Sequence, residues 1–156
     1  MKTKLLFLFI VASAFTSAFA QSPSLFTAAR SNDVNLAKSL LDAKADVNQQ
    51  DDKGYTPLIL ATYDDNYEVA DFLLKHGAKT EIKDHSGRTA LMGACFKGNE
   101  RDVKLLLDSG ANPDATDSKG LTSLMYAVMF GRISVIRVLR AGEAARSTTA
   151  QISSGR

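Results

Sequence analysis

The sequence contains few of the side chains from which catalytic and redox sites are usually built. Its 156 residues include a single cysteine, two histidines and no tryptophan. With one cysteine the chain cannot form an intramolecular disulfide, so packing must stabilise the fold. The chain also lacks a Gly-x-Ser-x-Gly motif, a phosphate-binding loop and a dinucleotide-binding fingerprint. We therefore expect a protein that is not an enzyme and that carries no cofactor.

A large excess of charge of one sign is missing as well. The sequence has 19 Lys and Arg against 17 Asp and Glu, and without Lys2 and Lys4 the two counts are 17 and 17. This balance does not favour nucleic acid or an anionic membrane as the main partner. Charge is uneven along the chain, because residues 21–131 hold 12 basic and 16 acidic side chains and residues 132–156 hold 5 and 1.

The first twenty residues have the pattern of a secretory signal peptide. Lys2 and Lys4 precede an apolar run over residues 5–11, and Ala18-Phe19-Ala20 supplies the small residues that a signal peptidase needs. We expect cleavage before Gln21 and a periplasmic or secreted protein with no membrane attachment afterwards. A retained membrane anchor is the alternative, although the apolar stretch is only marginally long enough.

Residues in the remainder of the chain recur every 33 positions. Four sets keep this interval: Gly54, Gly87 and Gly120; Thr56, Thr89 and Thr122; Leu58, Leu91 and Leu124; Ala61, Ala94 and Ala127. One interval earlier, Leu25 and Ala28 take the places of Leu58 and Ala61. Fixed self-similarity of this kind predicts four stacked units, at about 21–50, 51–83, 84–116 and 117–143. We expect residues 144–156 to form a disordered tail, because they contain one large apolar residue.

The repeated residues resemble the ankyrin motif. The resemblance is carried by Thr56-Pro57-Leu58 with Ala61, by Phe72-Leu73-Leu74-Lys75-His76-Gly77-Ala78, and by the matching segments of the next unit. It implies an all-α solenoid of about four helix-turn-helix units joined by short β-turn or hairpin-like connections, and we expect a monomer. The sequence departs from the ankyrin motif at two kinds of position. Ile59, Met92 and Met125 replace His, whereas Asn32 and Asp65 replace a turn Gly and tolerate left-handed backbone.

The resemblance also implies a concave binding face, made by the turn tips and by the first helix of each unit. Two sets of residues are candidates: Tyr55, His85, Arg88 and Leu121 at the tips; Tyr63, Phe96 and Met129 on the helices, with Lys97 and Phe130 beside them. Apolar residues on such a surface favour binding of a protein partner. The alternative is that Tyr63, Phe96 and Met129 pack against the helix of the next unit.

Two functional classes stay open. The first is an exported interaction module, such as an inhibitor, an immunity factor or an enzyme-assisting factor. The second is a small-molecule or redox accessory protein that uses Cys95 or His85, although the small neighbours of Cys95 favour a packing role. A metal site at the turn tips is not expected, because packed helices lie about 8–10 Å apart whereas metal–ligand bonds are about 2 Å long.

Overall fold

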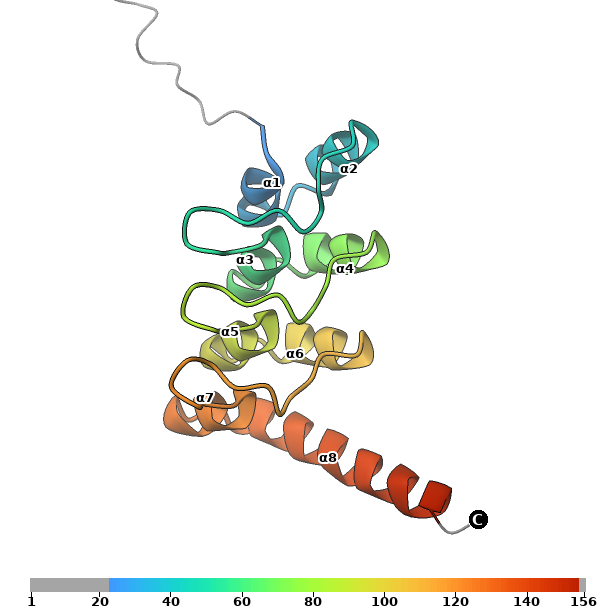
Figure 1. Ribbon diagram of the computed structural model, residues 1–156. Helices are drawn as coiled ribbons and strands as arrows, with labels where there is room; N and C mark the ends of the chain where they lie inside the picture. Colours follow the sequence, from blue (N-terminus) through green and yellow to red (C-terminus); the bar gives the residue numbers. More distant parts are fainter. Residues whose placement is uncertain (1–22, 155–156) are drawn as a thin grey trace, which may run out of the picture.

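The computed structural model describes residues 23–154 of the chain, with side chains to residue 143, as a stack of helix pairs (Figure 1). The expected signal peptide lies outside the described residues. The helices are α1 (Leu25–Ser31), α2 (Val34–Asp42), α3 (Pro57–Tyr63), α4 (Tyr67–Lys75), α5 (Ala90–Lys97), α6 (Glu100–Asp108), α7 (Ser123–Met129) and α8 (Ile133–Ser154). Residues 23–154 contain no strand. The predicted all-α solenoid of stacked helix pairs is confirmed.

The helices form two columns, and each helix packs mainly on its neighbours in the stack. The first helices, α1, α3, α5 and α7, lie in one column, and α2, α4 and α6 lie in the other, followed by α8 (Figure 1). The small side chains of Ala61, Ala94 and Ala127 are completely buried in the first column. Such small residues let the backbones of successive first helices approach closely, so neighbouring units supply the core that one unit lacks.

A threonine begins the first helix of each of the last three units. The side chain of Thr56 accepts a hydrogen bond from the Ile59 N–H at 3.1 Å, and Pro57 occupies the first turn. Thr89 and Thr122 cap α5 and α7 in the same way at 3.4 Å. The caps satisfy N–H groups that no helical carbonyl can reach, which fixes where each helix starts.

Each turn tip is built around one aspartate. Asp84 Oδ1 accepts hydrogen bonds from the Ser86 and Arg88 N–H groups at 2.8 and 2.9 Å. Asp51 and Asp117 make the equivalent pairs of bonds. Gly87 follows with a φ of 78°, and a Cβ there would lie 2.6 Å from the Ser118 nitrogen. Successive tips therefore require glycine and pack directly on one another.

Hydrogen bonds across the units reinforce the stack at two levels. At the tips, the His85 N–H donates to the Lys53 carbonyl at 3.1 Å, and the Ser118 N–H donates to the Ser86 carbonyl at 3.0 Å. Between the columns, the residue before α4, α6 and α8 donates to a carbonyl in the first helix of the preceding unit: Asn66 to Ala29 at 2.7 Å, Asn99 to Thr62 at 2.8 Å and Arg132 to Phe96 at 3.0 Å. These side chains satisfy carbonyls at helix ends.

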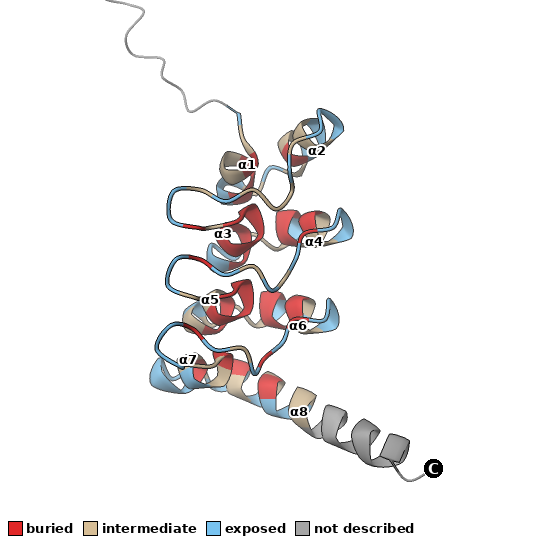
Figure 2. Cartoon of the chain, viewed as in Figure 1, coloured by how far each residue is buried: buried red, intermediate tan, exposed pale blue. Residues whose placement is uncertain are grey.

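The two ends of the stack differ. At the N-terminal end, Ser24 and Thr27 form a capping box, so their hydroxyl groups bond within α1. At the C-terminal end, Met125 and Val128 are 47% and 55% exposed, although Met92 and Cys95 at the same positions of the preceding unit are fully buried. Figure 2 shows this loss of burial from α5 to α7. The outer face of α7 is thus a packing face that no later unit covers in the described chain.

The last helix extends beyond residue 143, into the segment for which we expected a disordered tail. Helix α8 runs to Ser154, whereas α4 and α6 end before Gly77 and Gly110, whose φ values are 90° and 85°. Gly142 comes one residue earlier in its unit and has no positive φ, so the helix passes through it. Glu143, Ala144 and Ala145 then continue it, because these residue types have high helix propensity.

Candidate protein-binding face

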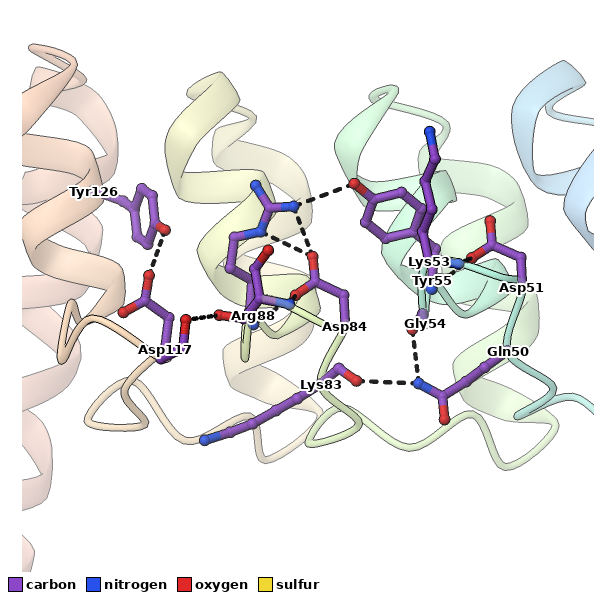
Figure 3. Close-up of polar contacts among 12 residues, drawn as sticks. Gln50, Asp51, Lys53, Gly54, Tyr55, Lys83, Asp84, Arg88, Asp117 and Tyr126 are labelled. Atoms are coloured by element: carbon purple, nitrogen blue, oxygen red, sulfur yellow. Dashed lines mark hydrogen bonds and ion pairs between the residues drawn. The ribbon is translucent and has the colours of Figure 1, made fainter.

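The turn tips and the first helices share one side of the stack, which we call the inner face. Its polar centre joins two units. Both Arg88 Nε and an Arg88 terminal nitrogen lie 2.8 Å from Asp84 Oδ2, and the same terminal nitrogen donates to the Tyr55 hydroxyl at 3.2 Å (Figure 3). Although burial opposes it, the hydrogen bond that Arg88 donates to Asp84 raises the pKa of Arg88. The guanidinium is therefore permanently charged and held in one orientation.

The next tip repeats this arrangement with a different donor. The Tyr126 hydroxyl donates to Asp117 Oδ2 at 2.7 Å (Figure 3). Burial and this hydrogen bond raise the pKa of Tyr126 to about 12. Burial alone would raise the pKa of Asp117, but the Leu121 N–H and the Tyr126 hydroxyl lower it. Asp84 and Asp117 thus each fix one large side chain on the inner face.

An aromatic row crosses the inner face at the ends of the first helices. The rings of Tyr63 and Phe96 are stacked with centroids 5.9 Å apart and an interplanar angle of 8°. Phe96 meets Phe130 edge to face at 4.4 Å. The Lys97 ammonium lies 4.8 Å from the centre of the Tyr63 ring. Because Tyr63 and Phe130 are 37% and 43% exposed, the row is a surface feature that spans three units.

The remaining candidates lie around these two groups. Leu121 is half-buried at the third tip, and His85 is exposed at the second. Met129 is 62% exposed at the end of α7, and Phe130 rather than Met129 continues the row. Met129 was expected at the centre of the binding face with Tyr63 and Phe96; it is exposed on the surface, and its part in binding stays a prediction. Phe130 directly follows the last residue of α7 and meets Phe96 edge to face.

Comparison with known protein families shows the family to which the chain belongs. A family model described as ankyrin repeats (three copies) matches residues 25–117 and 83–150. The chain belongs to the ankyrin-repeat family. Ankyrin repeats are in general protein–protein interaction modules rather than catalysts. A search of the curated proteins found no match.

Sequence reasoning missed three residues of this ankyrin-repeat face. Asp84, Gly93 and Tyr126 all line the inner face with Arg88 and the aromatic row. A signal for two of them was present, since Leu60, Gly93 and Tyr126 occupy the same position in successive units. A leucine, a glycine and a tyrosine at one position change the shape of the surface from unit to unit.

Cys95, the redox candidate of the alternative function, does not have the setting of a reactive residue. Cys95 is completely buried in α5, and burial raises the pKa of its thiol to about 12. Its thiolate is therefore scarce at neutral pH, which is the opposite of a reactive cysteine. His85 is exposed at a tip. Within residues 23–143 no group of three or more His, Cys, Asp or Glu side chains is placed to hold a metal ion.

None of the helices in the described part of the chain combines the length and apolar character needed to cross a bilayer.

Proposed function

We propose that this ankyrin-repeat protein binds a protein partner through its inner face, with the aromatic row at the centre of the contact. The observation that carries the proposal is the row itself: the rings of Tyr63, Phe96 and Phe130 contact one another across three units and remain partly exposed. Aromatic side chains beside fixed cations are typical of interface centres. An inhibitor, an immunity factor or an enzyme-assisting factor would use such a face in this way.

The polar groups of the inner face support the same proposal. Arg88 is tied to Asp84 and to Tyr55, so it loses little side-chain freedom when a partner contacts it. Lys97 lies over the Tyr63 ring and brings positive charge next to the apolar row. Aromatic surface with nearby fixed charge allows both apolar burial and electrostatic selection of the partner.

The test measures binding and folding together. The protein without residues 1–20 is used to isolate its partner from periplasmic or secreted extract, and the purified partner is titrated with the wild type and with Phe96→Ala. We expect Phe96→Ala to weaken binding about thirtyfold, which corresponds to about 2 kcal/mol. Phe96→Ala is expected to lower stability less than Leu106→Ala, a core control that should cost about 2–5 kcal/mol. Equal destabilisation by both variants would make the row part of the core and overturn the proposal.

Export is part of the proposed function and has its own test. The basic, apolar and small-residue segments of residues 1–20 motivate it. Intact mass and N-terminal sequencing of the protein from fractionated cells should show a chain that begins at Gln21 outside the cytoplasm. A chain that still begins at Met1 would contradict export.

A further inference from the structure

The inner face is hollowed between the second and third units. The hollow has a volume of about 250 Å³, and its walls include Tyr55, Leu60, Tyr63, Gly93, Phe96 and Tyr126. Sites that enclose a whole small molecule usually measure about 300–1,000 Å³. The size of this hollow is therefore better matched to one large side chain than to a free metabolite.

Gly93 forms part of the wall, and the fold does not require it. It lies inside α5 with no positive φ, and a Cβ added to it would meet only Tyr63 Cδ2, at an ordinary 3.6 Å. Glycine inside a helix costs about 0.5–1 kcal/mol relative to alanine. The preceding and following units carry Leu60 and Tyr126 at this position. The missing side chain thus leaves room in the face at a cost in stability that packing does not explain.

The walls of the hollow are aromatic, and its mouth is positive. Arg88 and Asp84 compensate each other inside the network described above. The remaining charged residues of the lining are Arg30 and Lys53 against Asp64, which leaves one net positive charge. All three are exposed. A ligand in the hollow therefore contacts aromatic rings and lies near exposed side chains with a net positive charge.

We propose that this hollow is the specificity pocket of the binding face and that it receives one aromatic side chain of the partner, next to an acidic residue in the partner's chain. The proposal rests on the proposed function, since it assigns the chemistry of the same face. Rings such as Tyr55, Tyr63 and Phe96 favour an aromatic guest in stacked or edge-to-face contact. Arg30 and Lys53 favour a neighbouring carboxylate.

A library of short random peptides, displayed on phage and selected on the protein lacking residues 1–20, provides the probe. We expect the selected peptides to share an aromatic residue beside Asp or Glu. Gly93→Leu fills the hollow with the residue of the preceding unit and should weaken a selected peptide by about tenfold or more. Gly93→Ala is the matched control; it should raise the melting temperature and change affinity little, because it fills less of the space.

If Gly93→Leu does not fold, reversing the charges beside the hollow provides an independent test. Replacing exposed Arg30 and Lys53 by Glu leaves the core intact and should weaken the selected peptide by about tenfold. The pocket proposal would be overturned by selected peptides that lack an aromatic residue or by unchanged peptide binding to Gly93→Leu. It would also be overturned if phenylacetate, a free small molecule with an aromatic ring and a carboxylate, bound as tightly as the peptide. The outcomes separate the two proposals: if the natural partner is lost with Phe96→Ala but binds Gly93→Leu normally, the binding face stands and the pocket does not.

Discussion

Asp102 in α6 occupies the position that Val69 occupies in α4, and both side chains are completely buried. Neither carboxylate oxygen of Asp102 has a hydrogen-bond partner among the described residues. Burial, with a further contribution from Asp65, raises the pKa of Asp102 from 3.8 to about 7. The ankyrin stack therefore holds an unpaired acid where a valine would pack.

Replacing Asp102 by Val should stabilise the protein, and more so at high pH. Because the folded-state pKa is raised, the carboxyl costs least below its unfolded pKa of 3.8; the cost grows as pH rises from there to about 7 and is constant above that. We expect Asp102→Val to gain at least about 2 kcal/mol at about pH 8 and clearly less at about pH 4. Urea unfolding at the two pH values measures the difference.

Two controls separate the charge of Asp102 from its polarity. Asp102→Asn keeps a buried polar group but cannot ionise, so the extra loss of stability at high pH should disappear while part of the cost remains. Asp108→Val changes an exposed acid of the same helix and should alter stability by less than about 0.5 kcal/mol. A gain for Asp102→Val that is the same at both pH values would show that ionisation is not the cause.

Methionine at the same position of two successive units should contribute strongly to stability in the first unit and little in the second. Met92 is fully buried between α5 and its neighbours, whereas Met125 is 47% exposed on the uncovered face of α7. We expect Met92→Ala to lower the free energy of unfolding by about 2–5 kcal/mol and Met125→Ala by less than about 1 kcal/mol. If the two variants are equally destabilised in chemical unfolding, something in solution covers α7.

Much of the fold could be predicted because the residues that recur every 33 positions are those that begin helices and form turns. Thr56 and its equivalents begin helices, and the glycines after the tip aspartates take left-handed backbone. Asn32 and Asp65 also take positive φ, at 53° and 61°. These features are local, so each can be inferred from a few neighbouring residues.

The features that could not be predicted depend on contacts between units. The edge-to-face contact between Phe96 and Phe130 joins residues at different positions of two units, so the repeat interval does not determine it. The burial of Asp102 depends on the helices packed around α6. Continuation of α8 beyond Gly142 depends on the conformation of one glycine. Each outcome follows from a departure from the repeat rather than from the repeat itself.

The hydrogen bonds between the helix columns should contribute measurably to stability. Asn99 Nδ2 donates to the buried Thr62 carbonyl at 2.8 Å. Asn99→Ala leaves that carbonyl without this donor, and we expect a loss of about 1–2 kcal/mol. Asn35→Ala, an exposed change in α2, is the matched control and should be nearly neutral. Thermal unfolding of both variants decides; equal melting temperatures would mean that water replaces the Asn99 side chain without loss.

Thiol labelling tests whether Cys95 is a packing residue or a reactive group. The pKa of its thiol is raised from 9.0 to about 12, so at neutral pH its thiolate fraction is about a thousandfold smaller than that of an ordinary cysteine. Val128 takes the same position one unit later and is 55% exposed. The matched control is therefore Val128→Cys in a Cys95→Thr background. Threonine is chosen because Thr62 occupies this position in the preceding unit.

We expect a disulfide reagent to label the Val128→Cys control rapidly in the folded state and native Cys95 only as fast as the protein opens. Both thiols should react at similar rates in concentrated urea, which shows that the difference comes from the fold. Thr62 donates its hydroxyl to the Leu58 carbonyl at 3.0 Å, so Cys95→Thr has a bond available and should fold. Rapid labelling of native Cys95 would contradict its burial and restore the redox alternative. Slow labelling leaves the exposed inner face, with Phe96 at its centre, as the functional surface to be tested.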